Sequence, residues 1–230
     1  MGPGPPTPPR PDLAAALRLM LVTDDDLMAG RDWLAVCRAA ESGGATAIQV
    51  RSHRLAPREL VELVRSIVAS VTVPVLVNDR LDVALAAGAA GVHLGAGDMP
   101  VDAARRLAPA GFILGASVGS DSDTATGAGA DYWGIGPLRD TTTKADAGPP
   151  LGPEGLARLV VEAGGIPCVA IGGVRPEDVA VAADAGASGV AVISGILGRL
   201  RGGAVADVAA AAAGYAAAWR DWSHRGPRGC

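Results

Sequence analysis

Short runs of β-branched and other apolar residues alternate along the chain with longer, alanine-rich segments that favour helices. The runs are apolar at nearly every position, which is typical of strands in a parallel sheet covered by helices on both faces. The pattern predicts eight strands, at residues 19–23, 47–51, 73–78, 91–95, 112–117, 132–136, 167–172 and 189–194.

A faint internal repeat supports a repeated strand and helix unit. Residues 84–95, 127–136 and 182–195 each contain a glycine, about two further residues and then a strand pattern. The glycines, Gly88, Gly129 and Gly186, are predicted to end helices in the left-handed conformation, where a Cβ is costly. Eight such units predict an α/β fold, the (β/α)8 TIM barrel, and a doubly wound open sheet is the alternative.

The proline pattern sets the expected domain limits. Residues 1–11 are too rich in proline for helix or strand and are predicted to be a disordered leader, and residues 223–230 a disordered tail. Between them we expect one barrel domain over residues 12–222, with a short extra N-terminal helix over residues 12–17 before the first strand.

Charge and composition narrow the classes of partner that this protein is expected to bind. Charges of both signs are interspersed and sum to −4, so no basic stripe is available for a nucleic acid. No apolar run reaches the roughly 20 residues of a membrane span, and no signal peptide pattern opens the chain, so we expect a cytoplasmic protein that uses neither membrane nor nucleic acid.

Three cysteines without paired spacing, Cys37, Cys168 and Cys230, favour buried thiols over disulfides or zinc. Trp219 and Trp222 on the last predicted helix are interpreted as packing or interface residues. The pattern leaves the oligomeric state open, including a homo-oligomer.

The only lysine, Lys144, follows three threonines, Thr141, Thr142 and Thr143, in a Gly/Pro-rich loop after the sixth predicted strand. Hydroxyls, exposed backbone N–H groups and an ammonium group are suited to binding phosphate oxygens. Survival of one lysine in an arginine-rich composition is the alternative explanation.

Two further glycine loops predict a second phosphate site. Gly172 and Gly173 follow the seventh strand, and Ser194 follows the eighth, where TIM barrels commonly bind phosphate. A simple tight turn at the two glycines is the alternative.

Asp79 and Asp98 lie at the ends of adjacent predicted strands and could share one Mg²⁺, which favours one or two carboxylates together with water and phosphate. In the alternative, Asp79 pairs with Arg80 and Asp98 caps the helix near Pro100. His93 is interpreted as a core histidine without a role. Two anion sites beside a cation predict group transfer with departure of diphosphate.

Several segments, in order, resemble thiamine phosphate synthase, also called thiamine-phosphate pyrophosphorylase. They are LMLVTDD, GATAIQVR, VLVNDRLDVALAAGAAGVHLGAGDMP, ILGASVG, GADYWGIGP followed by TTTKADAG, VAIGGV and GVAVISGI, over about residues 19–200. The resemblance implies a (β/α)8 enzyme that joins a pyrimidine methyl diphosphate to a thiazole phosphate by a dissociative substitution, forming thiamine phosphate and diphosphate.

The resemblance also implies roles for individual residues. It makes Arg51, Lys144 and Ser117 catalytic, and Asp79 and Asp98 the ligands of Mg²⁺. Substrate binding falls to Gln49, Arg51, His53, Asn78, Ser117, Thr141, Thr142, Thr143, Lys144, Gly173, Ile193 and Ser194.

Two departures from the family pattern keep alternatives in view. His53 stands where the family usually has a lysine, which motivates a catalytically silent barrel that binds phosphorylated thiazole or thiamine ligands. A related thiazole tautomerase needs a histidine two residues after Ser117, where this chain has Gly119, and it lacks the paired aspartates. The resemblance therefore favours the synthase, and the preferred thiazole variant stays open.

Overall fold

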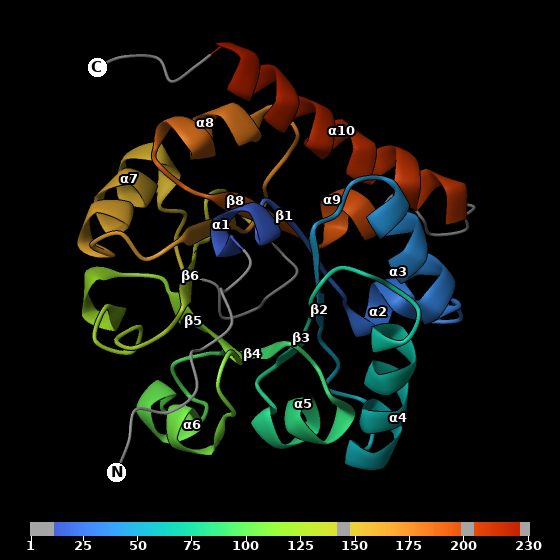
Figure 1. The fold of residues 1–230 in the computed structure, drawn as a ribbon. Coiled ribbons are helices and arrows are strands. Elements are labelled where there is room, and N and C mark those ends of the chain that lie inside the picture. The colour runs from blue at the N-terminus through green and yellow to red at the C-terminus, as the bar shows by residue number, and fades with distance from the viewer. Residues whose placement is uncertain (1–11, 142–147, 199–204, 226–230) are drawn as a thin grey trace.

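The eight predicted strands form one closed, all-parallel barrel in sequence order, with β8 paired to β1. The computed structural model describes residues 12–141, 148–198 and 205–225. Figure 1 shows the ring of strands with helices around its outside. The strands are β1 (Leu19–Val22), β2 (Ala47–Val50), β3 (Val75–Asn78), β4 (Gly91–Leu94), β5 (Ile113–Val118), β6 (Tyr132–Ile135), β7 (Cys168–Ile171) and β8 (Gly189–Val192).

Helices follow most of the strands, and a short helix precedes the first one, as predicted. The helices are α1 (Leu13–Ala16), α2 (Asp25–Met28), α3 (Trp33–Ser42), α4 (Pro57–Val68), α5 (Leu81–Ala87), α6 (Val101–Leu107), α7 (Gly152–Glu162), α8 (Asp178–Asp184), α9 (Ser194–Leu197) and α10 (Val205–Arg225).

One crossover differs from the predicted unit. Between β5 and β6 the chain forms a single 3-10 turn, η1 (Asp121–Asp123), followed by hydrogen-bonded turns, and no α-helix. Gly129 has the predicted left-handed conformation, with φ of 79°, but it ends these turns rather than a helix. Side chains of this segment compete for backbone groups, as Thr124 and Thr126 show by bonding the carbonyls of residues three positions earlier.

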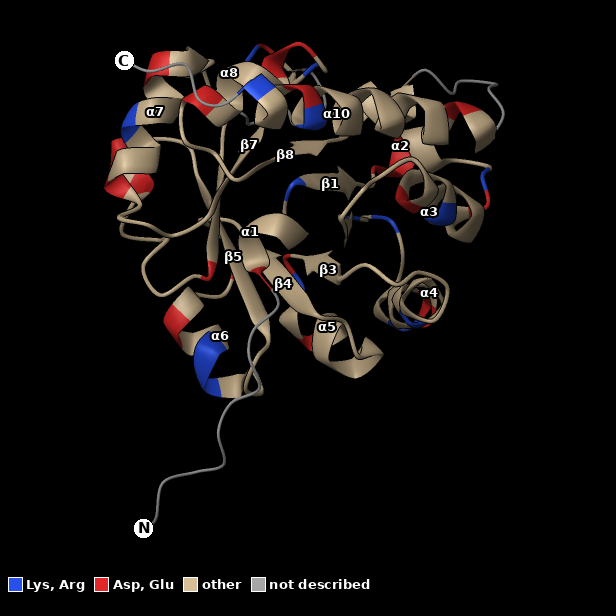
Figure 2. Cartoon of the chain, turned by 45° about the horizontal axis from the view of Figure 1, so that its top comes forward, with Lys and Arg blue, Asp and Glu red and all other residues tan. Residues whose placement is uncertain are grey.

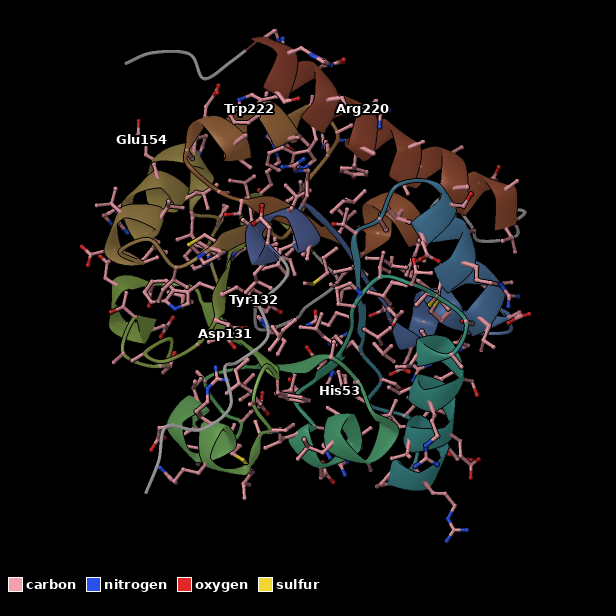
Figure 3. All side chains as sticks on the ribbon, in the orientation of Figure 1. His53, Asp131, Tyr132, Glu154, Arg220 and Trp222 are labelled. Carbon is pink, nitrogen blue, oxygen red and sulfur yellow. The ribbon has the colours of Figure 1, made fainter. Side chains whose placement is uncertain are left out.

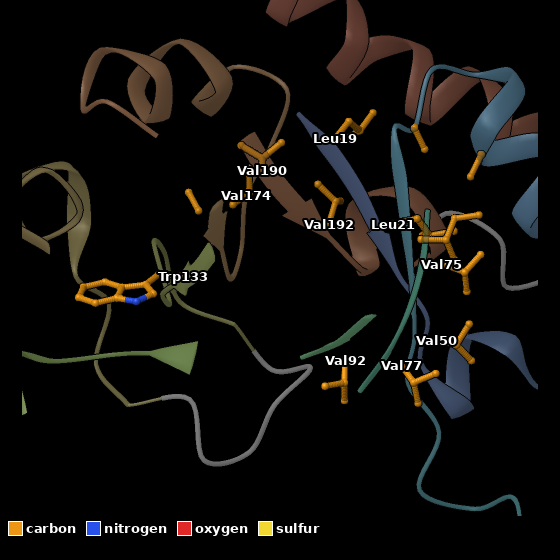
Figure 4. Close-up of a cluster of buried hydrophobic side chains, with 14 of the residues drawn as sticks. Leu19, Leu21, Val50, Val75, Val77, Val92, Trp133, Val174, Val190 and Val192 are labelled. Carbon is orange, nitrogen blue, oxygen red and sulfur yellow. The ribbon is translucent and has the colours of Figure 1, made fainter. Parts of the chain in front are cut away.

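The strands are apolar on both faces because each face meets a separate core. Outward-facing side chains such as Leu21, Val50, Val77 and Val92 pack beneath the helices (Figure 4). Inward-facing side chains fill the barrel, and Leu17, just after α1, belongs to the same inner cluster. The other fully buried members of that cluster are Met20, Val22, Ala47, Leu76, Tyr132, Val169 and Ala191.

The last helix, α10, packs against α3, α8 and α9 (Figure 1). It continues to Arg225, so the predicted tail from residue 223 begins inside a helix. Near this end of α10, the Nε1 of Trp222 donates a hydrogen bond of 2.7 Å to Oδ1 of Asp184, which ties the helix to α8. Trp219 is buried and meets Trp222 edge to face, in agreement with a packing role.

Surface charges and thiols agree with the sequence. Basic and acidic side chains lie interspersed on the helices (Figure 2), with pairs such as Arg106 and Asp102 along α6. Burial raises the pKa of the thiols of Cys37 and Cys168 to about 12, so both stay protonated at neutral pH. No helix in the described ranges combines the length and apolar character needed to cross a membrane.

Candidate active site

A cavity of about 710 Å³ opens at the carboxyl ends of the strands. Inward-facing positions change from apolar to polar toward this end of the barrel. On β3, for example, Leu76 lies in the inner core and Asn78 lines the cavity. Because strand side chains alternate, the last inward position of each strand faces this space.

The strand β2 and the segment after it carry three of the predicted substrate-binding residues, and all three line the cavity: Gln49 on the strand, then Arg51 and His53. Gln49 is only 3% exposed, and its Nε2 is buried with no hydrogen-bond partner among the described residues. A buried amide donor without a partner costs about 1–3 kcal/mol. Such an atom is suited to an acceptor on a bound ligand.

Residues after β1 fix the segment after β2. The Thr23 Oγ1 accepts from the Arg51 N–H at 2.8 Å and donates to the Arg51 carbonyl at 3.0 Å. A guanidinium nitrogen of Arg51 lies 3.1 Å from Oδ2 of Asp24. The backbone N–H of His53 donates to Oδ2 of Asp25 at 2.8 Å. Arg51 and His53 therefore occupy a segment that the preceding loop holds in place.

Asp79 and Asp98 line the same cavity, at the ends of β3 and β4. Asp79 has φ of 64°, and among the described non-glycine residues it alone has a positive φ. Its backbone N–H donates to the His93 carbonyl on β4 at 2.8 Å. Residues in such sparsely populated conformations cluster at functional sites.

The structural alternatives for the two aspartates do not match the observed contacts. Arg80 forms its ion pair with Asp82, at 2.6 Å, rather than with Asp79. Asp98 accepts a 2.7 Å hydrogen bond from the backbone N–H of Gly95, and the cap position of α6 is Pro100, without a side-chain cap bond. Neither the pairing of Asp79 with Arg80 nor the capping of α6 by Asp98 is therefore observed.

The donor set fits Mg²⁺ better than a closed metal site. No cluster of three or more His, Cys, Asp or Glu side chains suited to a metal occurs within residues 12–141, 148–198 and 205–225. Two carboxylates beside a cavity match an ion that completes its octahedron with water and ligand phosphate. Asp79 and Asp98 are the residues that would hold it.

Ser117 on β5 lines the cavity next to two side chains that the sequence analysis gave no role. The Ser117 Oγ lies 2.9 Å from Nε2 of His93 on β4. The Nδ1 of the same ring lies 2.9 Å from the hydroxyl of Tyr132 on β6. Both residues line the cavity as well. The two ring nitrogens of His93 have partners, as expected for a satisfied histidine, but its half-buried ring lies at the cavity wall rather than inside the core. Figure 3 shows Tyr132 inside the ring of strands and Trp222 on its outside.

The loops after β6 and β7 approach each other closely at the cavity edge. Backbone N–H groups of Leu138 and Arg139 donate to the carbonyls of Ile171 and Gly172. Gly173 has φ of 65°, and a Cβ there would lie 2.7 Å from the carbonyl oxygen of Asp140. Glycine is therefore required at this position, for both conformation and space.

An ion pair between an exposed arginine and a buried aspartate secures this contact. Arg139 bonds both carboxylate oxygens of Asp178 at the start of α8, with a distance of 2.8 Å from Nε to Oδ2. Asp178 is 1% exposed and also accepts from the backbone N–H of Arg175. The glycine loop after β7 is thus held against the loop that leads to Thr141.

Most predicted phosphate-binding residues meet at this edge. Thr141, Gly173, Ile193 and Ser194 line the cavity, as does Asn78 on the opposite side. Thr142, Thr143 and Lys144 lie outside the described residues, between Thr141 and Gly148, which both line the cavity.

Fold and cavity together define a TIM-barrel protein whose mouth suits phosphorylated ligands. A family model described as thiamine monophosphate synthase matches residues 19–196. The chain belongs to this family.

Individual relatives agree with that assignment. A thiamine-phosphate synthase of Methanoculleus marisnigri is 46% identical over 199 residues, which cover 84% of this chain and 91% of that protein. A thiamine-phosphate synthase of Moorella thermoacetica is 45% identical over 199 residues, with the same coverage. The solved structure of thiamine phosphate pyrophosphorylase from Pyrococcus furiosus superposes with a TM-score of 0.79 at 35% identity, covering 92% of this chain and 99% of that one.

Proposed function

We propose that this protein joins 4-amino-2-methyl-5-pyrimidinylmethyl diphosphate to a thiazole phosphate, giving thiamine phosphate and diphosphate. The observation that carries the proposal is the single cavity that gathers Gln49, Arg51, Asp79, Asp98 and Ser117 from four neighbouring strands and their following segments. Membership of the thiamine monophosphate synthase family supports the same reaction.

The pyrimidine end of the first substrate is assigned to β2 and β3. The buried, unpartnered Nε2 of Gln49 would donate to a ring nitrogen, and Asn78 offers both a donor and an acceptor. A pyrimidine carrying an amino group needs both kinds of partner. This explains why two amide side chains line one wall of the cavity.

The diphosphate is assigned to Arg51, His53, Ser117 and Lys144. Arg51 is the described guanidinium on the cavity wall, and its backbone is fixed by Thr23. Fixed donors near a departing group stabilise the charge that develops on it without reorganising. His53 would contribute a neutral or charged donor where relatives in the family pattern have a lysine.

Mg²⁺ is the cofactor that the two carboxylates of Asp79 and Asp98 fit, and when bound it supplies charge neutralisation on the diphosphate. The left-handed backbone of Asp79 and the hydrogen bond from the Gly95 N–H to Asp98 would hold both carboxylates at the cavity rim.

The thiazole phosphate is assigned to the opposite edge. Gly173, Ile193, Ser194 and Thr141 line it, and Thr142 and Thr143 follow Thr141 in the sequence. Glycine there leaves backbone N–H groups accessible to phosphate oxygens. The reacting thiazole nitrogen would then face the pyrimidine methylene across the cavity.

The chemistry proceeds as a dissociative substitution. The bond between the methylene carbon and the diphosphate oxygen breaks first, and both electrons leave with the oxygen. The lone pair of the thiazole nitrogen then forms the new bond to the methylene carbon. The barrel wall positions the two fragments, which is its main task when no proton must move.

The test is to incubate the purified protein with both substrates and Mg²⁺ and to measure thiamine phosphate and diphosphate. We expect both products in equal amounts. Retained binding of the thiazole phosphate without product would favour the catalytically silent barrel, and rearrangement of a thiazole substrate alone would favour the tautomerase.

The loop lysine has a test of its own. Lys144→Ala should lower kcat by more than ~100-fold, as for other groups that stabilise charge at the chemical step. Near-normal turnover would remove Lys144 from the proposed machinery. A cytoplasmic location and the oligomeric state stay predictions from the sequence.

A further inference from the structure

Three side chains on the cavity wall form a hydrogen-bonded chain that runs from β6 through β4 to β5. The hydroxyl of Tyr132 lies 2.9 Å from Nδ1 of His93, and Nε2 of His93 lies 2.9 Å from Oγ of Ser117. The three residues come from adjacent strands, because β5 pairs with β4 on one side and β6 on the other. Tyr132 lies toward the inside of the strand ring in Figure 3.

Two glycines make room for the chain. A Cβ at Gly115 would overlap the ring of Tyr132, and a Cβ at Gly134 would lie 2.9 Å from Cε1 of His93. Neither glycine has a left-handed backbone, so conformation does not explain them. Their shared feature is the space they leave for the two rings.

The burial of Tyr132 fixes the direction of the hydrogen bonds. Tyr132 is 1% exposed, and burial raises the pKa of its hydroxyl, which therefore keeps its proton. A buried hydroxyl proton without an acceptor costs about 1–3 kcal/mol, and Nδ1 of His93 is the partner observed beside this hydroxyl. An Nδ1 that accepts leaves the proton of a neutral imidazole on Nε2.

The same logic extends to the serine. A proton on Nε2 of His93 would be donated to Oγ of Ser117, which lies 2.9 Å away, and Oγ would then act as acceptor toward the ring. The hydroxyl proton of Ser117 must then point away from His93. The remaining space beside Ser117 is the cavity.

We infer that Tyr132 and His93 are positioning residues, which fix the Ser117 hydroxyl as a hydrogen-bond donor toward an acceptor atom of the bound pyrimidine diphosphate. The identity of that ligand rests on the proposed function. The direction of the hydrogen bonds within the chain does not depend on it.

A double-mutant cycle tests the inference through activity. Tyr132→Phe removes one hydroxyl and keeps the ring, and it should lower kcat about tenfold, the scale of one misdirected hydrogen bond. The KM for the thiazole phosphate should stay within about twofold. In a Ser117→Ala background the same substitution should cost less than about twofold, because the group through which it acts is already gone.

A purely structural role gives the opposite result. Loss of packing around Tyr132 would lower activity by the same factor in both backgrounds, and that additivity would overturn the inference. Circular dichroism and melting temperatures of the four proteins show whether each variant is folded.

A second measurement needs neither turnover nor a change in the chain of side chains. The protein contains three histidines, so His53→Asn together with His224→Asn leaves His93 as the only one. Ring ¹⁵N shifts at pH 7.5 should report a neutral imidazole with its proton on Nε2. A proton on Nδ1, or on both nitrogens, would contradict the inference. If the wild-type protein formed no thiamine phosphate, the proposed function would fail while this measurement still decided the hydrogen-bond direction.

Discussion

At the scale of single residues, Asp79 combines a costly backbone with a place on the cavity wall. Its φ of 64° lies in the left-handed region, which aspartate and asparagine tolerate better than most residues. Asp79→Asn should therefore keep the backbone while removing the charge. We expect kcat to fall by more than ~100-fold with Mg²⁺ present, and the melting temperature to change by only a few degrees.

A neighbouring aspartate supplies the control for that measurement. Asp82 is exposed and pairs with Arg80, so Asp82→Asn removes one carboxylate from the same segment without touching the cavity. It should leave steady-state kinetics near those of the wild type. Equal losses in both variants would point to general disruption of the segment rather than to a lost metal ligand.

Gln49 is a second residue on the cavity wall whose presence lowers the stability of the fold while it offers a group for ligand binding. Its buried Nε2 has no partner in the described part of the chain, and an apolar residue of similar size would avoid that cost. Gln49→Met should raise the free energy of unfolding by about 0.5–1 kcal/mol in the absence of substrate.

The same substitution should weaken binding of the pyrimidine diphosphate by at least about tenfold and leave binding of the thiazole phosphate unchanged. Urea unfolding and calorimetric titration measure the two effects separately. A variant that is less stable and binds normally would show that Gln49 serves the core and not the pyrimidine.

At the scale of elements, the strands could be predicted from the sequence and the connections only in part. All eight predicted strands occur. They are recognisable in the sequence because neighbouring residues such as Val77 and Leu76 pack into the outer and the inner core, so both faces of a strand are apolar. Gly129 was predicted to end a helix because the glycine and the strand pattern after it match the pattern at Gly88 and Gly186. The side chains of Asp123, Thr124 and Thr126 instead bond local backbone groups, which favours turns.

The contact between α3 and α10 depends on a glycine that the sequence did not single out. Gly43 follows α3, and a Cβ there would clash with the carbonyl oxygen of Ala209 and lie 2.8 Å from Cβ of Ala212, both on α10. Gly43→Ala should lower the free energy of unfolding by about 1–3 kcal/mol, because helix and backbone must move apart. Denaturant unfolding measures the change.

Ser42→Ala is the matched control, since Ser42 is exposed on the preceding position of the same helix. It should change the free energy of unfolding by less than about 0.5 kcal/mol. A Gly43→Ala variant as stable as this control would mean that α10 does not press against α3 in solution.

At the scale of the whole molecule, the barrel explains which site residues could be predicted from the sequence. Residues at strand ends were predicted, whereas His93 and Tyr132 on the cavity wall were not. Asp79 directly follows β3 and Ser194 lies two residues after β8, and in a parallel barrel such positions alone assign them to one rim. His93 lies inside an apolar strand, and its link to Tyr132 arises only when β4, β5 and β6 lie side by side. The one available sequence signal was the pair of strand glycines, Gly115 and Gly134, which leave space for both rings.

The closed barrel also couples ligand binding at the rim to the stability of the entire fold. Because β8 pairs with β1, the two ends of the sheet support each other, and we expect binding at the rim to protect all strands together. Inorganic diphosphate and Mg²⁺ at about 100 times the dissociation constant should stabilise the protein by about 2.7 kcal/mol, which raises the melting temperature by about 5–10 °C.

The effects of Mg²⁺ and diphosphate on the melting temperature should depend on each other, because Asp79 and Asp98 would hold the proposed ion and the ion would neutralise charge on the diphosphate. Either one alone should shift the melting temperature by much less than both together, and Asp79→Asn should remove most of the joint effect while Asp82→Asn preserves it. Differential scanning fluorimetry measures all arms in one experiment. A diphosphate shift that is equally large with a chelator present, or in Asp79→Asn, would remove Mg²⁺ from the site and leave Arg51 and the loop of Lys144 to hold the anion.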